Sequence, residues 1–259
     1  YQWKKDGLDI TGETNATLNI TDANATLHDG NYSVVVSNDF GSVESDLTEV
    51  LVKEEILNGL VGWWKFDETN GTVAYDSSGN GNHGNLMNGP TWVSGKIGGA
   101  LNFDGVNDFM SVNQNFFYNK SFSFSSWVKN SLNNKYILVH GSAHQNNQSL
   151  HFGFRGSGTM GLYFAFYSND LESTFTGLLD WSVYTFTFDN VSKKRASYAN
   201  GNQVSFDTSP SSYIGSGNLI IGKSSVTGSD YYIKILDDVR IYDRALSAPE
   251  VQALYNLGQ

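Results

Sequence analysis

Apolar and polar residues alternate along residues 235–242, near the C-terminal end of the chain. An alternation with a period of two predicts a β-strand whose two faces carry different side chains. One face would carry Ile235, Asp237, Val239 and Ile241, and the other would carry Leu236, Asp238, Arg240 and Tyr242. Burial of the Asp237 carboxylate on the aliphatic face would cost on the order of several kcal/mol unless cations or backbone N–H groups meet it. We therefore expect Asp237 either to bind a metal ion or to form a hydrogen-bonded tie, with a short helix following at 249–255.

Further strands are expected throughout the larger, C-terminal part of the chain. Alternating or apolar segments between turn residues predict strands at 122–129, 149–154, 162–167, 181–189, 195–198 and 218–222. The composition agrees, because aromatic residues make up 14% of the chain and there are 27 Gly but only 3 Pro. The absence of cysteine excludes a disulfide framework and a thiolate metal site. The predicted class is all-β.

Residues 1–53 show a pattern of short strands separated by turns. Strands are expected at 1–7, 16–20, 30–38 and 43–45. This part resembles an immunoglobulin-like domain of the intermediate type, and the resemblance rests on Trp3, Leu18, Ile20 and the tyrosine-corner segment Asp29-Gly30-Asn31-Tyr32. Val34 stands where the family usually has a cysteine, so the inter-sheet disulfide is missing.

Two strands that precede the Trp-bearing strand in that family have no counterpart before Trp3. The missing strands are expected upstream in a longer parent protein. The alternative is that another chain supplies them by strand addition, since an incomplete sandwich has unpaired edges. Residues 54–59 are expected to form a short, semi-rigid linker.

Residues 60–259 resemble a laminin-G-like, concanavalin A-like jelly roll. The resemblance rests on Gly62-Trp63-Trp64-Lys65-Phe66-Asp67-Glu68, the loop 76–84, the Gly-rich segment 95–105 and the strand 122–129, which follow one another in the family's order. The expected fold is therefore a two-sheet jelly roll, preceded by an incomplete immunoglobulin-like sandwich. In such a fold Trp127 and Trp181 are expected in the core, while the adjacent Trp63 and Trp64 would face opposite ways.

The loop 76–84 is rich in Asp, Ser, Asn and Gly, which suits a tight turn presenting oxygen atoms to a hard cation. The resemblance implies a structural calcium ion near the closing strand, with Asp76, Asn80, Asp237 and Asp238 as ligands. A hydrogen-bonded turn without metal is the alternative for the same residues.

Aromatic side chains are the usual platforms for sugar rings, while neighbouring polar groups bond the hydroxyls. The segment 163–170 places aromatic residues on both faces of a strand that ends in polar residues. We therefore expect a glycan-binding surface formed by Tyr163, Tyr167, Asn169, Asp170 and, from another segment, Trp92.

Catalytic chemistry is not favoured by the spacing of the ionisable residues. Glycoside cleavage needs two carboxyl groups at a defined separation, and the large domain contains three Glu, of which Glu172 is interpreted as a solvated loop residue. His140, His144 and His151 fall in a polar loop and a strand, which is not a zinc-site spacing. A lyase site built from Tyr163, His151 and Arg155 remains the enzymatic alternative.

The net charge of −10 and the pI near 4.8 make nucleic acid an unfavourable partner. No apolar segment approaches the length of a membrane span. The expected function is non-catalytic carbohydrate binding or adhesion, in a larger secreted or cell-surface protein, bacterial in origin and stabilised by calcium. The alternative is a structural or protein–protein interaction module of an extracellular assembly.

Overall fold

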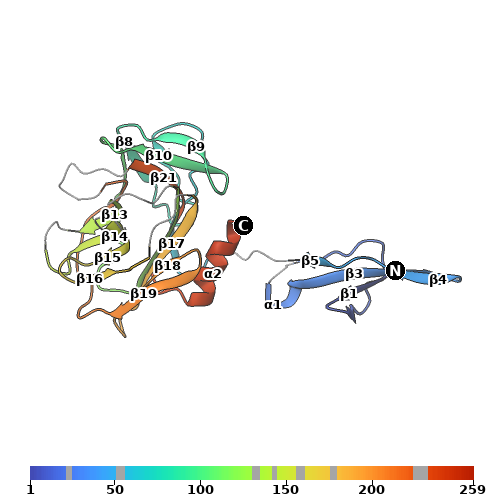
Figure 1. Ribbon diagram of the computed structural model, residues 1–259. Coiled ribbons are helices and arrows are strands. Elements are labelled where there is room, and N and C mark those ends of the chain that lie inside the picture. Colours follow the sequence, from blue (N-terminus) through green and yellow to red (C-terminus); the bar gives the residue numbers. More distant parts are fainter. Residues whose placement is uncertain are drawn as a thin grey trace. The chain divides into compact units, whose positions relative to one another are not determined.

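The computed structural model describes residues 1–21, 25–50, 56–129, 135–141, 145–155, 161–175, 180–223 and 233–259 (Figure 1). It divides the chain into two compact units, Tyr1–Glu55 and Ile56–Gln259, with the division inside the predicted linker. No helix among the described residues is long and apolar enough to cross a membrane.

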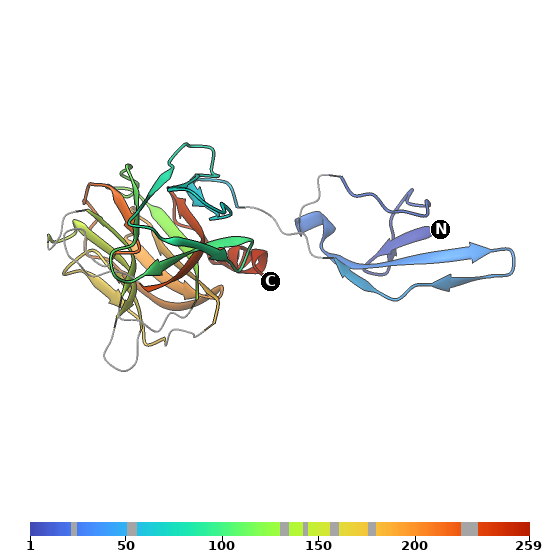
Figure 2. The ribbon, with the colours of Figure 1, turned by 90° about the horizontal axis from the view of Figure 1, so that it is seen from above.

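The N-terminal unit contains, among its described residues, one five-stranded antiparallel sheet and a short helix. The elements are β1 (Gln2–Lys5), β2 (Leu8–Asp9), α1 (Ala25–His28), β3 (Gly30–Asn38), β4 (Gly41–Glu44) and β5 (Thr48–Val50). The sheet order is β2-β1-β3-β4, and β5 also pairs with β3. The long hairpin of β3 and β4 is seen clearly in Figure 2.

Two local predictions for this unit have different outcomes. The Tyr32 hydroxyl donates a hydrogen bond to the His28 carbonyl at 2.9 Å, the bond expected of a tyrosine corner. The strand predicted at 16–20 is wrong, because these residues have no hydrogen-bonded neighbouring strand. Leu18 and Ile20 nevertheless line the apolar face of the sheet. The immunoglobulin-like assignment stays a prediction.

The large unit contains two eight-stranded antiparallel sheets among its described residues. The first sheet has the order β19-β18-β17-β12-β21-β10-β9, with β6 also paired to β21, and the second has the order β16-β15-β14-β13-β20-β11-β8-β7. The bounds in the first sheet are β6 (Leu60–Trp64), β9 (Thr91–Ser94), β10 (Gly99–Asp104), β12 (Phe122–Lys129), β17 (Ser182–Phe188), β18 (Lys194–Ala199), β19 (Asn202–Thr208) and β21 (Ile233–Tyr242). The bounds in the second are β7 (Val73–Ala74), β8 (Gly84–Met87), β11 (Phe109–Val112), β13 (Tyr136–Gly141), β14 (Ser149–Arg155), β15 (Gly161–Ala165), β16 (Asp170–Glu172) and β20 (Leu219–Ile221).

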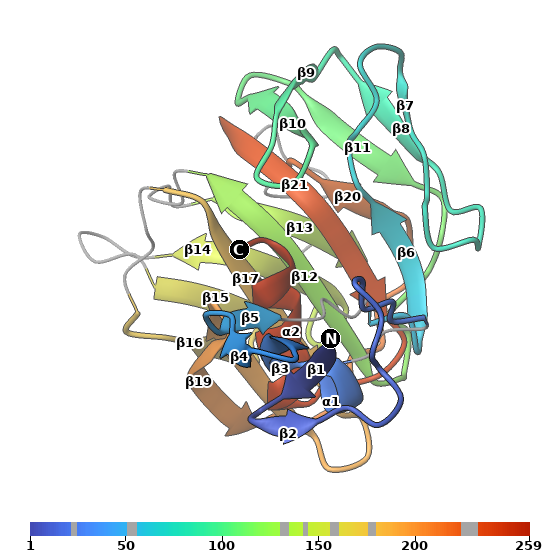
Figure 3. The same cartoon turned by 90° about the vertical axis from the view of Figure 1, so that its right-hand side faces the viewer.

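This arrangement confirms the predicted all-β jelly roll. Helix α2 (Ala248–Leu257) follows the closing strand, as predicted. Figure 3 shows β21 crossing the first sheet beside β12, with β6 and β10 nearby. Strand β19 was not predicted, because most of its residues are polar and exposed.

The core between the sheets is rich in phenylalanine. Phe124 and Phe186 of the first sheet both stack on Phe152 of the second, with ring centroids 5.3 and 4.9 Å apart. Such aromatic pairs contribute about 0.5–1.5 kcal/mol each beyond the area that they bury. The period-two alternation of β12, β14 and β17 places these rings inside and leaves the intervening residues on the outer faces.

A second apolar cluster lies on the outer face of the first sheet, beneath α2. It contains Leu60, Trp63, Ala196, Tyr198, Tyr242, Leu246, Val251 and Leu254. Trp64 enters the main core while Trp63 enters this second cluster, so the two adjacent rings face opposite ways and both are buried. Trp127 is buried, but against Tyr255 of α2 instead of between the sheets, and Trp181 is half-buried just before β17. The predicted burial of Trp127 is therefore confirmed, although α2 and not the second sheet covers it, whereas the predicted burial of Trp181 is wrong, since this side chain is half-buried.

A β-bulge changes the faces of the closing strand β21. Asp238 has a φ of +48°, and the register with β12 shifts between Ser125 and Trp127. A bulge adds one residue to a strand and resets its alternation. Leu236 therefore joins Val239 and Ile241 in the main core, and Asp237 does not share their face. The predicted alternation is wrong upstream of the bulge.

Candidate functional site

Four consecutive strands of the second sheet, β13 to β16, lie side by side (Figure 1). Their outer face carries a group of polar and aromatic side chains. Inward-facing residues such as Phe152, Phe154 and Leu171 belong to the core. Their neighbours along the same strands therefore face outward. We call these outward residues the Arg155 cluster: Tyr136, His151, Arg155, Tyr163, Asp170 and Glu172.

The strand register explains how these side chains meet. Tyr136, Gly153, Tyr163 and Glu172 stand opposite one another across the four strands. Gly153 has no side chain, so the rings of Tyr136 and Tyr163 stack across it with centroids 5.3 Å apart and an interplanar angle of 16°. A Cβ at Gly153 would lie 2.5 Å from the Cα of Tyr136. The glycine is therefore needed for this close approach.

Tyr163 is the centre of the cluster and is 4% exposed. Its hydroxyl donates to Asp170 Oδ2 at 2.8 Å and accepts from the Arg155 guanidinium at 2.8 Å. The guanidinium carbon also lies 4.9 Å from the centroid of the Tyr163 ring. Because Tyr136 and Arg155 cover this ring, Tyr163 positions its neighbours and does not offer an open platform for a sugar.

The exposed hydrogen-bonding groups of the cluster belong to Arg155 and two carboxylates. The side chain of Arg155 is 49% exposed and lies 3.8 Å from Asp170 and 3.5 Å from Glu172. The interpretation of Glu172 as a lone loop residue is therefore wrong, since it lies on β16 and is paired. Burial, followed by the hydrogen bond to Asp170, raises the pKa of Tyr163 above its usual value, so its hydroxyl stays protonated as a donor.

Tyr167 and Asn169, two other predicted ligand-binding residues, belong to the turn between β15 and β16. Tyr167 and Ser168 have φ values of +60° and +54°, as in the tight turns that join paired strands. The side-chain NH₂ group of the buried Asn169 donates to Asn147 and Ser209 at 3.0 and 2.7 Å, and the backbone carbonyl of Asn169 accepts from Arg195. Asn169 therefore holds neighbouring segments together.

Trp92 lies far from the Arg155 cluster, on the edge strand β9 of the first sheet (Figure 3). It borders a cleft of about 520 Å³, which we call the Trp92 cleft. The cleft is lined by Asp67, Glu68, Thr69, Trp92, Val93, Ser94, Gly98 and Gly99. The structure thus divides the predicted glycan-binding residues between two places. Asp67 and Glu68 were not predicted there, although they belong to the Trp63–Glu68 segment.

Two carboxylates hold the turn between β9 and β10. Asp237 Oδ2 accepts hydrogen bonds from the backbone N–H groups of Lys96 and Ile97, each at 2.8 Å, and Asp67 Oδ1 accepts one from Gly99 at 2.7 Å. Asp237 is fully buried, which raises its pKa to about 7 against the opposing effect of the bond from Ile97. The hydrogen-bonded tie predicted as one role of Asp237 is present.

The Gly-rich sequence of this turn has a steric reason. A Cβ at Gly95 would lie 2.6 Å from Asp237 Oδ2, and one at Gly98 would lie 2.2 Å from Asp67 Oδ1. A Cβ at Gly99 would meet the Phe66 carbonyl at 2.2 Å. The three glycines therefore let the two carboxylates approach the backbone closely.

Asp76 and Asn80, predicted as calcium ligands, tie the loop 76–84 to β6. The Asp76 carboxylate accepts from the backbone N–H groups of Trp63, Ser78 and Asn82 at 2.8–2.9 Å. The Asn80 side chain donates to the Leu60 carbonyl at 3.1 Å. Asp76 therefore faces N–H donors, which satisfy a carboxylate without a metal ion.

Asp238 is paired with protein groups. Its Oδ1 accepts from Trp63 Nε1 at 2.6 Å, and its Oδ2 lies 3.0 Å from Arg240 Nε. Within the described part of the chain, no three His, Cys, Asp or Glu side chains converge as a metal site. The four predicted ligands thus do not share one coordination shell. Asp237 Oδ1 is buried without a described hydrogen-bond partner, and calcium stays a prediction.

Two of the three histidines considered for a metal site lie in the described part of the chain. His140 lies in the core, where Nδ1 meets the Tyr213 hydroxyl at 2.8 Å, and burial lowers its pKa to about 4. His151 lies on the outer face, 4.7 Å from the ring centroid of Tyr136. His144 lies outside the described residues.

Solved structures share this fold. Domain 4 of an extracellular arabinanase from Geobacillus stearothermophilus, in complex with arabinotriose, is 19% identical, with a TM-score of 0.59 over 77% of this chain and 98% of that chain. The binding domain of a paraclostridial mosquitocidal protein is 18% identical, with a TM-score of 0.57 over 78% of this chain and 53% of that one. A Trypanosoma rangeli sialidase is 17% identical, with a TM-score of 0.57 over 76% of this chain and 32% of that one.

The sequence comparisons address the family directly. No curated protein sequence matches the chain. Residues 103–252, more than half of the chain, match the model of the concanavalin A-like lectin/glucanases superfamily. These residues include β12 and β21, the two strands at the centre of the first sheet. The chain therefore belongs to the concanavalin A-like lectin/glucanases superfamily.

Proposed function

We propose that this chain is a non-catalytic carbohydrate-binding module of a larger secreted or cell-surface protein. The observation that carries the proposal is the Arg155 cluster. It places a guanidinium and two carboxylates side by side on an outward face, fixed from below by Tyr163. Sugar hydroxyls both donate and accept hydrogen bonds, so a surface with charged donors and acceptors in fixed positions suits them.

The comparisons support the same class of function. The arabinanase domain with this fold was solved with arabinotriose, and the matching domain of the mosquitocidal protein is named as its binding domain. The first is one domain of an extracellular arabinanase, and the second is the binding domain of a mosquitocidal protein. An adhesive role, secretion and a stabilising calcium ion belong to our proposal as its finer parts.

The non-catalytic character is supported by the chemistry of the cluster. A lyase would need Tyr163 or a neighbour to remove a proton, and the raised pKa of Tyr163 disfavours its phenolate form. A glycosidase needs one carboxyl group to protonate the leaving group and another on the far side of the bond. Here both carboxylates approach the same guanidinium instead of standing on opposite sides of a bound sugar.

The test is a glycan array probed with the whole chain, followed by calorimetric titration of the glycans that bind. Arg155→Ala should weaken binding about tenfold or more, because a charged hydrogen-bond donor is worth about 1.5–3 kcal/mol. Lys120→Ala removes an exposed cation outside the cluster and should leave the affinity unchanged. Absence of binding to every neutral and acidic glycan, both with calcium and with chelator, would reject the proposal.

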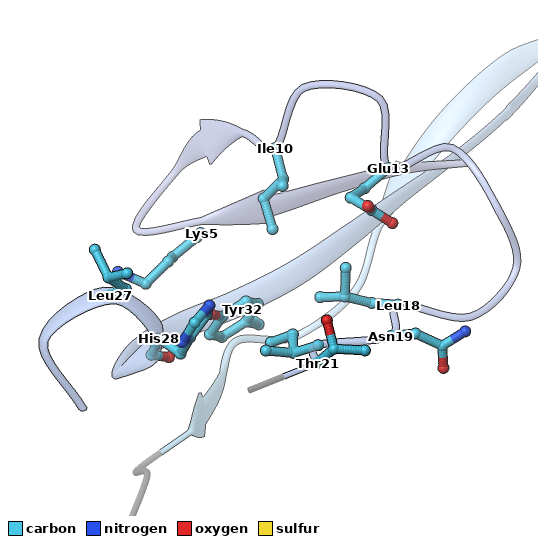
Figure 4. Close-up of a pocket in the computed structure, with 10 residues that line it drawn as sticks. Lys5, Ile10, Glu13, Leu18, Asn19, Thr21, Leu27, His28 and Tyr32 are labelled. Carbon is cyan, nitrogen blue, oxygen red and sulfur yellow. The ribbon is translucent and has the colours of Figure 1, made fainter. Parts of the chain in front are cut away.

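A protein-interaction module is the second candidate, and the N-terminal unit favours it. One face of its sheet forms an apolar groove of about 580 Å³ lined by Trp3, Leu18, Ile20, Tyr32 and Val34, among others. Figure 4 shows the adjoining pocket, where Ile10, Leu18 and Leu27 gather around Tyr32. Such a face suits strands of another chain that pack on it as the second sheet of a sandwich.

This second candidate predicts self-association or binding of a β-rich partner through the groove. Light scattering of the whole chain over a range of concentrations would detect pairing of copies. Val34→Glu should abolish that pairing, whereas Val191→Glu, at a 91% exposed position of the large unit, should not. Equal masses for all three proteins at every concentration would count against self-association.

A further inference from the structure

We infer that the Trp92 cleft is a second carbohydrate subsite, selective for uncharged sugar rings, and this inference rests on the proposed carbohydrate-binding function. The cleft and the Arg155 cluster belong to different sheets and share no residue. Its volume of about 520 Å³ is within the range of small-ligand sites.

Trp92 gives the cleft an aromatic wall whose position is fixed. The half-buried indole packs partly against the main core, and its remaining surface lines the cleft. The indole Nε1 donates to the Gly71 carbonyl at 3.3 Å, which connects the ring to the loop that follows β6. A ring held in this way can stack on the C–H face of a sugar without losing much side-chain freedom on binding.

Two carboxylates supply the polar part of the cleft, and each is held by one oxygen. Asp67 Oδ1 accepts from Gly99 N, and Glu68 Oε1 accepts from Tyr75 N, both at 2.7 Å. Glu68 Oε2 is shielded from solvent and has no hydrogen-bond partner among the described residues. An acceptor left in this state costs about 1–3 kcal/mol. A ligand hydroxyl would recover that free energy once the Glu68 side chain turns this oxygen, which solvent does not reach in the free protein, toward the cleft.

The charge of the lining determines which sugars fit. Asp67 and Glu68 are acidic, and the described lining contains no basic residue. A uronic acid or sulfated sugar would therefore meet like charge, whereas a neutral ring would offer hydroxyl donors to the same carboxylates. A metal ion would bind only the two carboxylates and would not use the Trp92 ring. A sugar would contact both the ring and the carboxylates.

The test follows the indole N–H signals of the whole ¹⁵N-labelled chain by NMR, with Trp92→Phe used to assign the Trp92 signal. We expect arabinotriose, xylotriose or cellotriose to shift this signal and trigalacturonate to leave it unmoved. Glu68→Gln should weaken the neutral ligand at least fivefold and reduce the discrimination against trigalacturonate. Asp39→Asn, which removes one exposed negative charge elsewhere, should change neither.

The outcomes separate this inference from the proposed function. Neutral sugars that bind by calorimetry without moving the Trp92 signal, with affinities unaffected by Glu68→Gln, would overturn the Trp92 subsite and leave carbohydrate binding in place. If calcium chloride shifts the Trp92 indole signal and no sugar does, the cleft is a cation site and the sugar subsite is rejected. Failure of every sugar to bind anywhere would reject both.

Discussion

Trp63 and Asp238 are 175 positions apart in the sequence and meet in a 2.6 Å hydrogen bond from the indole Nε1 to the carboxylate Oδ1. The bond joins β6, the first strand of the large unit, to the closing strand β21. Arg240 completes the group, with its guanidinium carbon 4.3 Å from the centroid of the Trp63 ring and its Nε 3.0 Å from Asp238 Oδ2. All three side chains are buried, and Trp63 belongs to the apolar cluster beneath α2.

Asp238→Ala should destabilise the large unit by about 3–5 kcal/mol, because it removes the counter-charge of a buried guanidinium. Asp238→Asn keeps the shape and an acceptor for Trp63 and should cost less. The measurement is urea unfolding of the whole chain at neutral pH. A loss below about 0.5 kcal/mol for Asp238→Ala would contradict the structural role of this pair.

The start of α2 predicts a loss of stability in acid. Glu250 accepts two hydrogen bonds from the Arg244 guanidinium and others from Ser247, and these interactions lower its pKa to about 2. Its folded pKa is below the unfolded value of about 4.3, so the stabilisation is present above the unfolded pKa and is lost as pH falls toward 2. Thermal melts between pH 6 and 2 should show this loss in the native chain and a smaller one in Glu250→Gln. Parallel curves for the two proteins would refute the assignment.

Substitution of Gly98 in the β9–β10 turn should reduce stability more than substitution of Gly79 in the loop 76–84. Gly98 and Gly79 both have positive φ, at +69° and +86°, but a Cβ at Gly98 would lie 2.2 Å from Asp67 Oδ1 and one at Gly79 would meet nothing within 4 Å. Gly79→Ala should cost about 1 kcal/mol for the backbone conformation alone. Gly98→Ala should cost about 2 kcal/mol more, because the Asp67 tie must move. Equal melting temperatures for the two variants would show that Asp67 yields without penalty.

Asp76 tests the hydrogen-bonded tie and the predicted calcium ion together. Asp76→Ala removes an acceptor from three backbone N–H groups and should destabilise by about 2–3 kcal/mol, in chelator as well as in calcium. Calcium that raises the melting temperature of the native chain, but not of the variant, would support an ion at this loop. Identical native melts in calcium and in chelator would reject the predicted ion.

The strand content of the large unit could be predicted because it depends on local alternation. Segments 122–129 and 182–188 alternate, and the aromatic residues that meet their partners in the core lie two positions apart: Phe122 and Phe124 in the first, and Tyr184, Phe186 and Phe188 in the second. The prediction of a strand at 16–20 was wrong, because a β-strand requires a neighbouring strand as well as a suitable sequence. No described strand pairs with these residues. The Asp238 bulge was also missed, since one extra residue changes the face without any composition signal.

The candidate sites could be predicted only in part. Tyr163, Asp170 and Arg155 were singled out, but the pairing of Arg155 with Glu172 depends on the order of β14, β15 and β16 in the second sheet. Trp92 was placed with Tyr163, whereas its neighbours are Asp67 and Glu68. A strand pattern shows which side chains share a face, and it does not show which strands become neighbours.

The sequence by itself determined the all-β class, the closing strand followed by a helix, and the exclusion of disulfide chemistry, because these depend on composition and short-range periodicity. The jelly-roll expectation came from motifs that resemble those of the family in their order. The tertiary structure decided the covering of Trp63 and Trp127 by α2, the use of Asp67 and Asp237 to hold one turn, and the separation of the Trp92 cleft from the Arg155 cluster. These features depend on sheet order and on contacts between distant segments. The free energy of such contacts depends on which surfaces meet, and that is fixed only when the chain has folded.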